Sequence, residues 1–133
     1  MSKILTLSIK QKYFDEILAG KKKQETREIR PNNAGRYIFY RCDGKDYTVD
    51  QIEQIPPDLP VEIVPVKYDA IKLLTGAYSG KRPFIVVEVK NAEPFILTDE
   101  NDEDIVYEYN GKEYLAAKIV YELGDIIEKS INV

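Results

Sequence analysis

The chain has 133 residues, and we expect residues 1–133 to fold as a single domain with its own hydrophobic core. It contains no histidine and only one cysteine, Cys42, which excludes an intrachain disulfide and a zinc site of the usual nitrogen and sulfur type. We therefore expect no metal and no other cofactor. The N-terminal apolar run is too short for a signal peptide and no stretch reaches membrane-spanning length, so we expect a cytoplasmic protein without a membrane partner.

The formal net charge of −4 hides an asymmetry along the chain. Residues 1–42 carry ten Lys and Arg against four Asp and Glu, whereas residues 43–133 carry nine against nineteen. The basic N-terminal third can present a positive face to a phosphate-bearing partner. The alternative is that these lysines are solvated and paired with nearby acids.

The hydrophobic periodicity predicts a mixture of short strands and helices. Alternation predicts strands, and apolar residues at i, i+3 and i+4 predict helices, with Gly20 as a helix C-cap. Prolines at 56, 57, 60 and 65 predict irregular structure over 43–66, apart from a helical turn. In the first half of the chain we predict a strand at 4–9, a helix at 11–19, strands at 23–29 and 36–41, and a helical turn at 49–54. A helix at 67–78 and a strand at 84–89 follow. The last part is predicted to contain an acidic loop at 98–104, a hairpin at 105–115 that turns at Asn110-Gly111, and a strand at 117–123 with a kink at Gly124.

These strands do not alternate regularly with helices, so a doubly wound parallel sheet is not expected. The pattern favours an α+β fold: a small mixed β-barrel with two or three short helices packed beside it. No repeat, low-complexity tract or linker divides the chain. The sequence leaves the oligomeric state and the role of the acidic loop at 99–104 open.

The segment 7–30 resembles the start of an ASCH domain, a family grouped with the PUA-like small barrels. The features that carry the resemblance are a strand, an amphipathic helix ending in a glycine, and a lysine followed by a glutamate and an arginine. Weaker similarities lie at 81–93 and 120–128. The matching residues of the first segment are Phe14, Ile17, Leu18, Gly20, Lys22, Glu25 and Arg27.

The charged residues of the segment 7–30 have the chemistry of a binding site. Residues two apart on a strand share a face, so Glu25 and Arg27 are expected to point the same way. A guanidinium held by a neighbouring carboxylate suits a phosphate or a base edge. The alternative is an ion pair without a binding role. The full set of expected ligand-binding residues is Lys22, Lys23, Glu25, Arg27, Arg30, Arg36 and Arg82.

The resemblance implies a module that binds RNA or a modified nucleotide, with RNA or a modified nucleoside as the partner. We expect the ligand in a basic cleft built around Lys22, Glu25 and Arg27. Some ASCH proteins are instead amidohydrolases that remove acyl groups from modified cytidine with a lysine, a threonine and a distant glutamate. Here Lys22 matches the lysine, but Glu25 occupies the threonine position, and a shift by one residue would offer Lys23 and Thr26 instead. The candidates for such a site are Lys22, Thr26 and Glu88. A third possibility is an interaction protein whose acidic C-terminal portion binds a basic partner.

Overall fold

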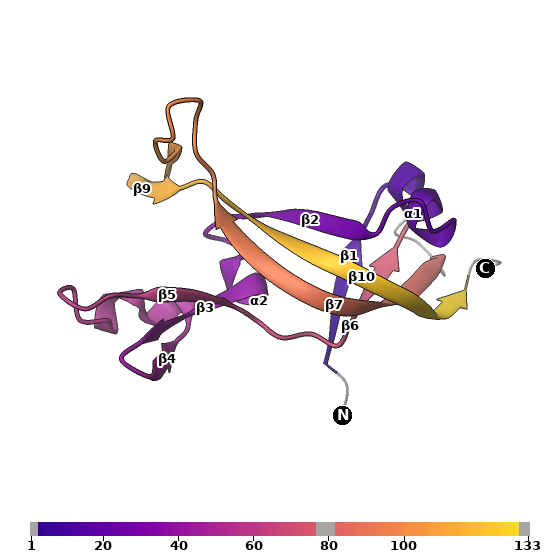
Figure 1. Ribbon diagram of the computed structural model, residues 1–133, viewed down its shortest axis with the longest axis horizontal. Coiled ribbons are helices and arrows are strands. Elements are labelled where there is room, and N and C mark those ends of the chain that lie inside the picture. Colours follow the sequence, from indigo (N-terminus) through magenta and orange to yellow (C-terminus); the bar gives the residue numbers. More distant parts are fainter. Residues whose placement is uncertain (1–2, 77–81, 131–133) are drawn as a thin grey trace. The chain divides into compact units, whose positions relative to one another are not determined.

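The computed structural model describes residues 3–76 and 82–130, which form two compact units (Figure 1). Unit 1 contains residues 1–25, 67–92 and 121–133 of the chain, and unit 2 contains residues 26–66 and 93–120. The fold is α+β: strands predominate and the described residues include three short helices, as the sequence predicts. The described sheets do not close into a barrel, so the PUA-like barrel stays a prediction, as does the single domain.

Unit 1 is built on a sheet whose strand order is β1-β6-β7-β10-β2, and its last three strands continue into unit 2. β1 pairs with β6 in parallel and β6 pairs with β7 antiparallel. Leu73 and Ile85, which lie opposite each other on β6 and β7, are completely buried. The elements are β1 (Ile4–Ser8), α1 (Gln11–Leu18), β2 (Gln24–Ile29), β6 (Ala70–Leu74), β7 (Phe84–Ile96) and β10 (Ala117–Ser130).

Unit 2 holds two small antiparallel sheets. One has the strand order β4-β3-β5, and the other is the hairpin β8-β9. The predicted Asn-Gly turn of the hairpin is confirmed, because Asn110 and Gly111 both have positive φ, 50° and 78°. The remaining elements are α2 (Ala34–Tyr37), β3 (Ile38–Cys42), β4 (Lys45–Tyr47), the 3₁₀ helix η1 (Val49–Gln54), β5 (Glu62–Pro65), β8 (Val106–Tyr109) and β9 (Lys112–Leu115).

The helix predicted over 67–78 is wrong. Residues 70–74 form β6, between β1 and β7, and residues 77–78 lie outside the described residues. Ala70, Ile71 and Leu73 are all buried within this sheet. The apolar spacing is compatible with a helix face or a buried central strand, and the two neighbouring strands decide in favour of the strand.

Three further predictions need correction. The strand predicted at 36–41 begins later, because Arg36 and Tyr37 belong to α2. The stretch around the prolines contains β4 and β5 as well as the predicted turn η1, and β5 ends at Pro65 on the edge of its sheet. The backbone passes through Gly124 without leaving β10, so this strand runs from Ala117 to Ser130.

Candidate functional site

The end of α1 and the turn that follows it set the position of the lysine-rich segment. Helix α1 buries Phe14 and Ile17, and Gly20 follows with φ of 75°, as expected of a C-cap glycine. The amides of Lys21 and Lys22 both donate to the carbonyl oxygen of Glu16, at 2.9 and 3.1 Å. This geometry holds the lysines at the negative end of the helix, where positive charge is favourable even without a ligand.

Lys22 is held from two sides within unit 1. Its Nζ lies 3.8 Å from Oε1 of Glu25 and 5.4 Å from the centre of the Tyr13 ring. Glu25 is buried on β2, with 5% of its surface exposed, whereas 27% of the Lys22 side chain stays accessible. Glu25 therefore orients the ammonium group but leaves it open to a ligand.

An open pocket of about 380 Å³ lies beside Lys22, within unit 1. The residues that line it include the apolar side chains of Ile17, Val87 and Leu123. Three lysines from two parts of the chain line it together with one carboxylate: Lys22, Lys23, Lys90 and Asp125. The volume lies within the range of small-molecule sites, and apolar walls with a few polar groups are typical of such sites. We call it the lysine pocket.

The wall of the lysine pocket at β10 depends on a glycine. The amide of Leu123 donates to the carbonyl oxygen of Lys23 at 2.9 Å, which fixes the lysine segment to this strand. Next to it, a Cβ on Gly124 would overlap the carboxylate of Glu88 and approach Cε of Lys90 to 3.1 Å. Without a side chain at Gly124, both Glu88 and Lys90 can pass close to the backbone at the pocket.

The remaining sequence-predicted site residues are distributed over both units. Lys23 lines the lysine pocket with Lys22, but Lys90 was not predicted; only the tertiary structure brings it there. On β2, Arg27 shares a face with Glu25, and Thr26 lies on the exposed opposite face. Arg27 belongs to unit 2, so its role as a ligand donor stays a prediction.

Two of the other three predicted arginines, Arg82 and Arg30, have contacts that indicate structural roles. The Arg82 guanidinium donates to the hydroxyl of Ser8 and to the backbone oxygens of Leu74 and Thr75, each at 3.4 Å. Arg30 in unit 2 forms an ion pair with Glu28, and Arg36 lies exposed on α2. A ligand contact by any of the three stays a prediction.

The amidohydrolase alternative needs Lys22, Thr26 and Glu88 to act together. The side chain that meets Lys22 is the Glu25 carboxylate, and strand alternation turns Thr26 to the other face of β2. Glu88 does approach the lysine pocket, at Gly124. The pocket therefore offers lysine donors and carboxylate acceptors, but the described residues that line it include no hydroxyl nucleophile.

No group of three or more His, Cys, Asp and Glu side chains in the described part of the chain could hold a metal ion. Within residues 3–76 and 82–130, no helix is both long and apolar enough to cross a membrane.

Comparisons with protein-family models, with curated proteins and with solved structures find no match to this chain.

Proposed function

We propose that this chain is a binding module for RNA or a modified nucleotide, with the lysine pocket as its ligand site. The observation that carries the proposal is the convergence of Lys22, Lys23 and Lys90 on one open pocket. Ammonium groups contact phosphate and carbonyl oxygens, and the carboxylate of Asp125 can accept from an exocyclic amine. The apolar residues of the lining suit the face of a base.

We also infer that the module is an ASCH-like member of the PUA-like barrels. The order of β1, α1, Gly20 and β2 supports this inference, because it reproduces the strand, helix, glycine and charged strand of the motif. The position of Lys22 at the pocket supports it as well. Closure of the strands into a barrel is part of the proposal.

The experiment is a salt titration of single-stranded RNA binding. For single strands, each phosphate that the protein neutralises contributes roughly 0.7 to the slope of log K against log salt. Lys90→Ala is expected to weaken binding and to reduce the slope by about this amount. Lys67→Ala is the matched control, because Lys67 is an exposed lysine of unit 1 outside the pocket. Equal slopes for both variants would contradict a phosphate contact at Lys90.

A second measurement separates binding from catalysis. Incubation with N4-acetylcytidine, followed by mass spectrometry, is expected to leave the acyl group in place, because Glu25 stands where the resemblance requires a threonine. Release of acetate that is abolished in Lys22→Ala would overturn the binding-only function and favour the amidohydrolase.

A further inference from the structure

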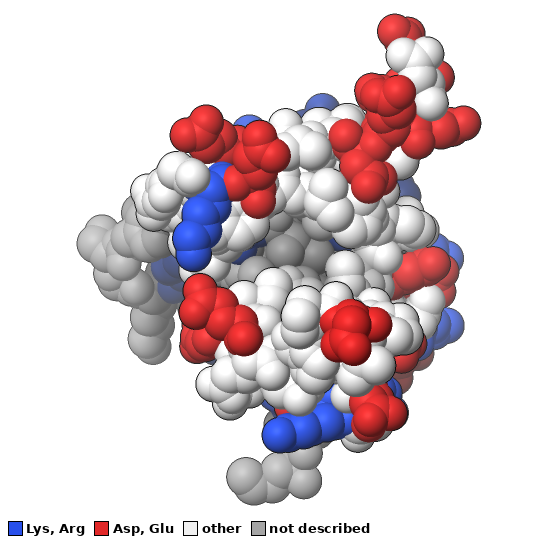
Figure 2. All heavy atoms as spheres, turned by 90° about the vertical axis from the view of Figure 1, so that its left-hand side faces the viewer, with Lys and Arg blue, Asp and Glu red and all other residues white. Residues whose placement is uncertain are grey.

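A second pocket, of about 400 Å³, lies within unit 2 and has a different chemistry. Aliphatic side chains make up much of its lining, among them Ile29, Ile38 and Ile63. Three tyrosines complete it: Tyr40 from β3, Tyr107 from β8 and Tyr114 from β9. We call it the tyrosine pocket. Figure 2 shows a face of the molecule with a hollow that uncharged residues surround, with Asp and Glu side chains at several places around it and Lys and Arg side chains beside some of them.

The aromatic rings of the pocket are fixed by the hairpin. Tyr107 and Tyr114 are directly opposite in the β8-β9 register, with ring centres 6.0 Å apart and planes inclined by 28°. Tyr109 meets Tyr114 edge to face at 6.3 Å. Burial raises the pKa of Tyr40, and the nearby Tyr114 adds to this effect. Three tyrosine rings therefore line the pocket, one of them with a partly desolvated hydroxyl, and the attraction of a cation to an aromatic ring is stronger at a desolvated site than at an exposed one.

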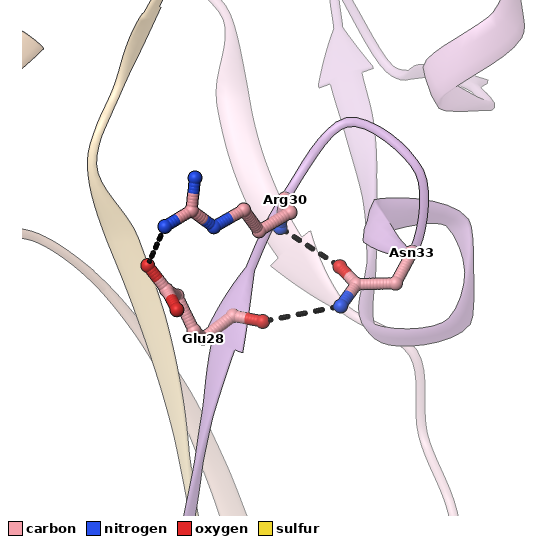
Figure 3. Close-up of polar contacts among 3 residues, drawn as sticks. All are labelled: Glu28, Arg30 and Asn33. Atoms are coloured by element: carbon pink, nitrogen blue, oxygen red, sulfur yellow. Dashed lines mark hydrogen bonds and ion pairs between the residues drawn. The ribbon is translucent and has the colours of Figure 1, made fainter. Parts of the chain in front are cut away.

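The chain already places one cation on this aromatic cluster. The Arg30 guanidinium carbon lies 4.8 Å from the centre of the Tyr107 ring. Its Nη2 is 2.7 Å from Oε1 of Glu28, so its charge is balanced (Figure 3). Asn33 secures this turn by accepting from the Arg30 amide at 2.8 Å and donating to the Glu28 carbonyl oxygen at 3.3 Å. Arg30 itself lines the pocket, where it is paired with Glu28, and the two carboxylates that also line the pocket outweigh its single positive charge.

The charge around the tyrosine pocket also favours a cation. The sequence of unit 2 contains seven Lys and Arg against fifteen Asp and Glu. Two carboxylate residues line the pocket, Asp50 from η1 and Glu113 from β9. Asp50 comes from η1, outside the hairpin, so it can be replaced without changing the strands that carry Tyr107 and Tyr114.

We propose that the tyrosine pocket binds an organic monocation, an ammonium or guanidinium group carried on an apolar stem. The stem would lie against the isoleucines and the cation against the tyrosine rings, on the side of Asp50. Anions such as RNA phosphates are disfavoured by the surrounding acids, so this site is independent of the lysine pocket. A free amine and the Lys or Arg side chain of a peptide share this chemistry.

The test uses the full-length chain and tyrosine fluorescence, which is informative because the chain has ten tyrosines and no tryptophan. The probes are 2-phenylethylammonium, its neutral analogue 2-phenylethanol and the anion 3-phenylpropionate. A capped Phe-Arg dipeptide distinguishes a peptide source from a free amine. The ammonium probe or the dipeptide is expected to bind, and the neutral and anionic probes are expected to bind more weakly.

Two pairs of variants assign the site. Tyr114→Leu is expected to weaken binding of the cation by roughly threefold to thirtyfold, whereas Phe84→Leu, which removes a ring of unit 1, leaves it unchanged. Asp50→Asn is expected to weaken binding of the cation by about two- to fivefold. Asp58→Asn is the control, because Asp58 lies outside the pocket, and it is expected to leave binding of the cation unchanged. Circular dichroism spectra of Asp50→Asn check that the variant is folded.

Binding of 2-phenylethanol as tight as that of the ammonium probe would overturn the proposal, because charge would then not be recognised. Preference for 3-phenylpropionate would also overturn it. If only the dipeptide binds, and Asp50→Asn weakens binding of the dipeptide, the proposal holds and the cation comes from a polypeptide.

Discussion

The two units differ in where they bury and where they expose their apolar residues. Of the eight largest fully buried side chains of the described residues, six lie in unit 1, on or next to the strands of its sheet. Unit 2 instead has eight of the eleven large hydrophobic side chains that are exposed in the described part of the chain. Unit 1 therefore holds most of these fully buried side chains, and unit 2 holds most of the exposed large apolar ones.

The units also differ in charge. Unit 1 contains twelve Lys and Arg against eight Asp and Glu, the reverse of the balance in unit 2. Each pocket matches its surroundings: lysines line the pocket of the basic unit, and tyrosines line the pocket of the acidic one. The net charge of the whole chain conceals this division, because the two contributions have opposite sign.

The largest expected effect tests this difference in burial. Leu73→Ala removes a completely buried side chain of β6 and is expected to lower the free energy of unfolding by about 2–5 kcal/mol. Ile52→Ala in unit 2 is the comparison, since 53% of Ile52 is exposed, and its effect is expected within about 0.5 kcal/mol. Urea denaturation measures the free energy of unfolding of both variants. Equal losses of stability would contradict the assignment of the main core to unit 1.

The second prediction concerns the hairpin that carries the tyrosines. Gly111→Ala places a side chain at φ of 78° and is expected to cost about 1 kcal/mol. The cation probe should bind more weakly to this variant, while RNA binding through the lysine pocket is unchanged. Gly35→Ala is the control, because a Cβ there makes only an ordinary contact, 3.5 Å from Val49. Thermal denaturation and the two binding assays check this prediction.

The third prediction distinguishes an effect on the lysine pocket from an effect on the stability of unit 1. In Gly124→Ala the new Cβ must displace Glu88 and Lys90, both through the ends of flexible side chains. Stability is therefore expected to change by less than about 1 kcal/mol, whereas RNA affinity falls about as much as in Lys90→Ala. A variant that binds RNA normally would show that the position of Lys90 does not matter for the ligand.

The smallest expected effect appears at alkaline pH in unit 2. Burial raises the pKa of Tyr40 above its ordinary value of 10.0, so the folded chain holds this proton more tightly than the unfolded chain. The resulting stability is fully present below about pH 10, the ordinary pKa of tyrosine, and is lost as the pH rises towards the higher folded pKa. Urea midpoints measured across this range should fall less steeply for Tyr40→Phe than for the unchanged chain. Identical slopes would argue against desolvation of this hydroxyl.

The sequence by itself determined the elements whose signals are local. The apolar stripe with Gly20 predicts α1, the Asn110-Gly111 turn predicts the hairpin, and the helical turn at 49–54 is found at the predicted residues. It also placed Lys22 and Lys23 directly after the helix, which is enough to bring both to the lysine pocket. These features depend on neighbouring residues along the chain, so composition and spacing suffice to predict them.

Tertiary structure decided the features that depend on distant partners. Residues 70–74 form a strand because β1 and β7 lie on either side, although their spacing also suits a helix. Lys90 reaches the lysine pocket because β7 lies next to β10, and Tyr40 joins the tyrosine pocket from a different sheet than Tyr107. Hydrogen bonds and burial between such segments form only when the chain folds, and no local pattern in the sequence records them.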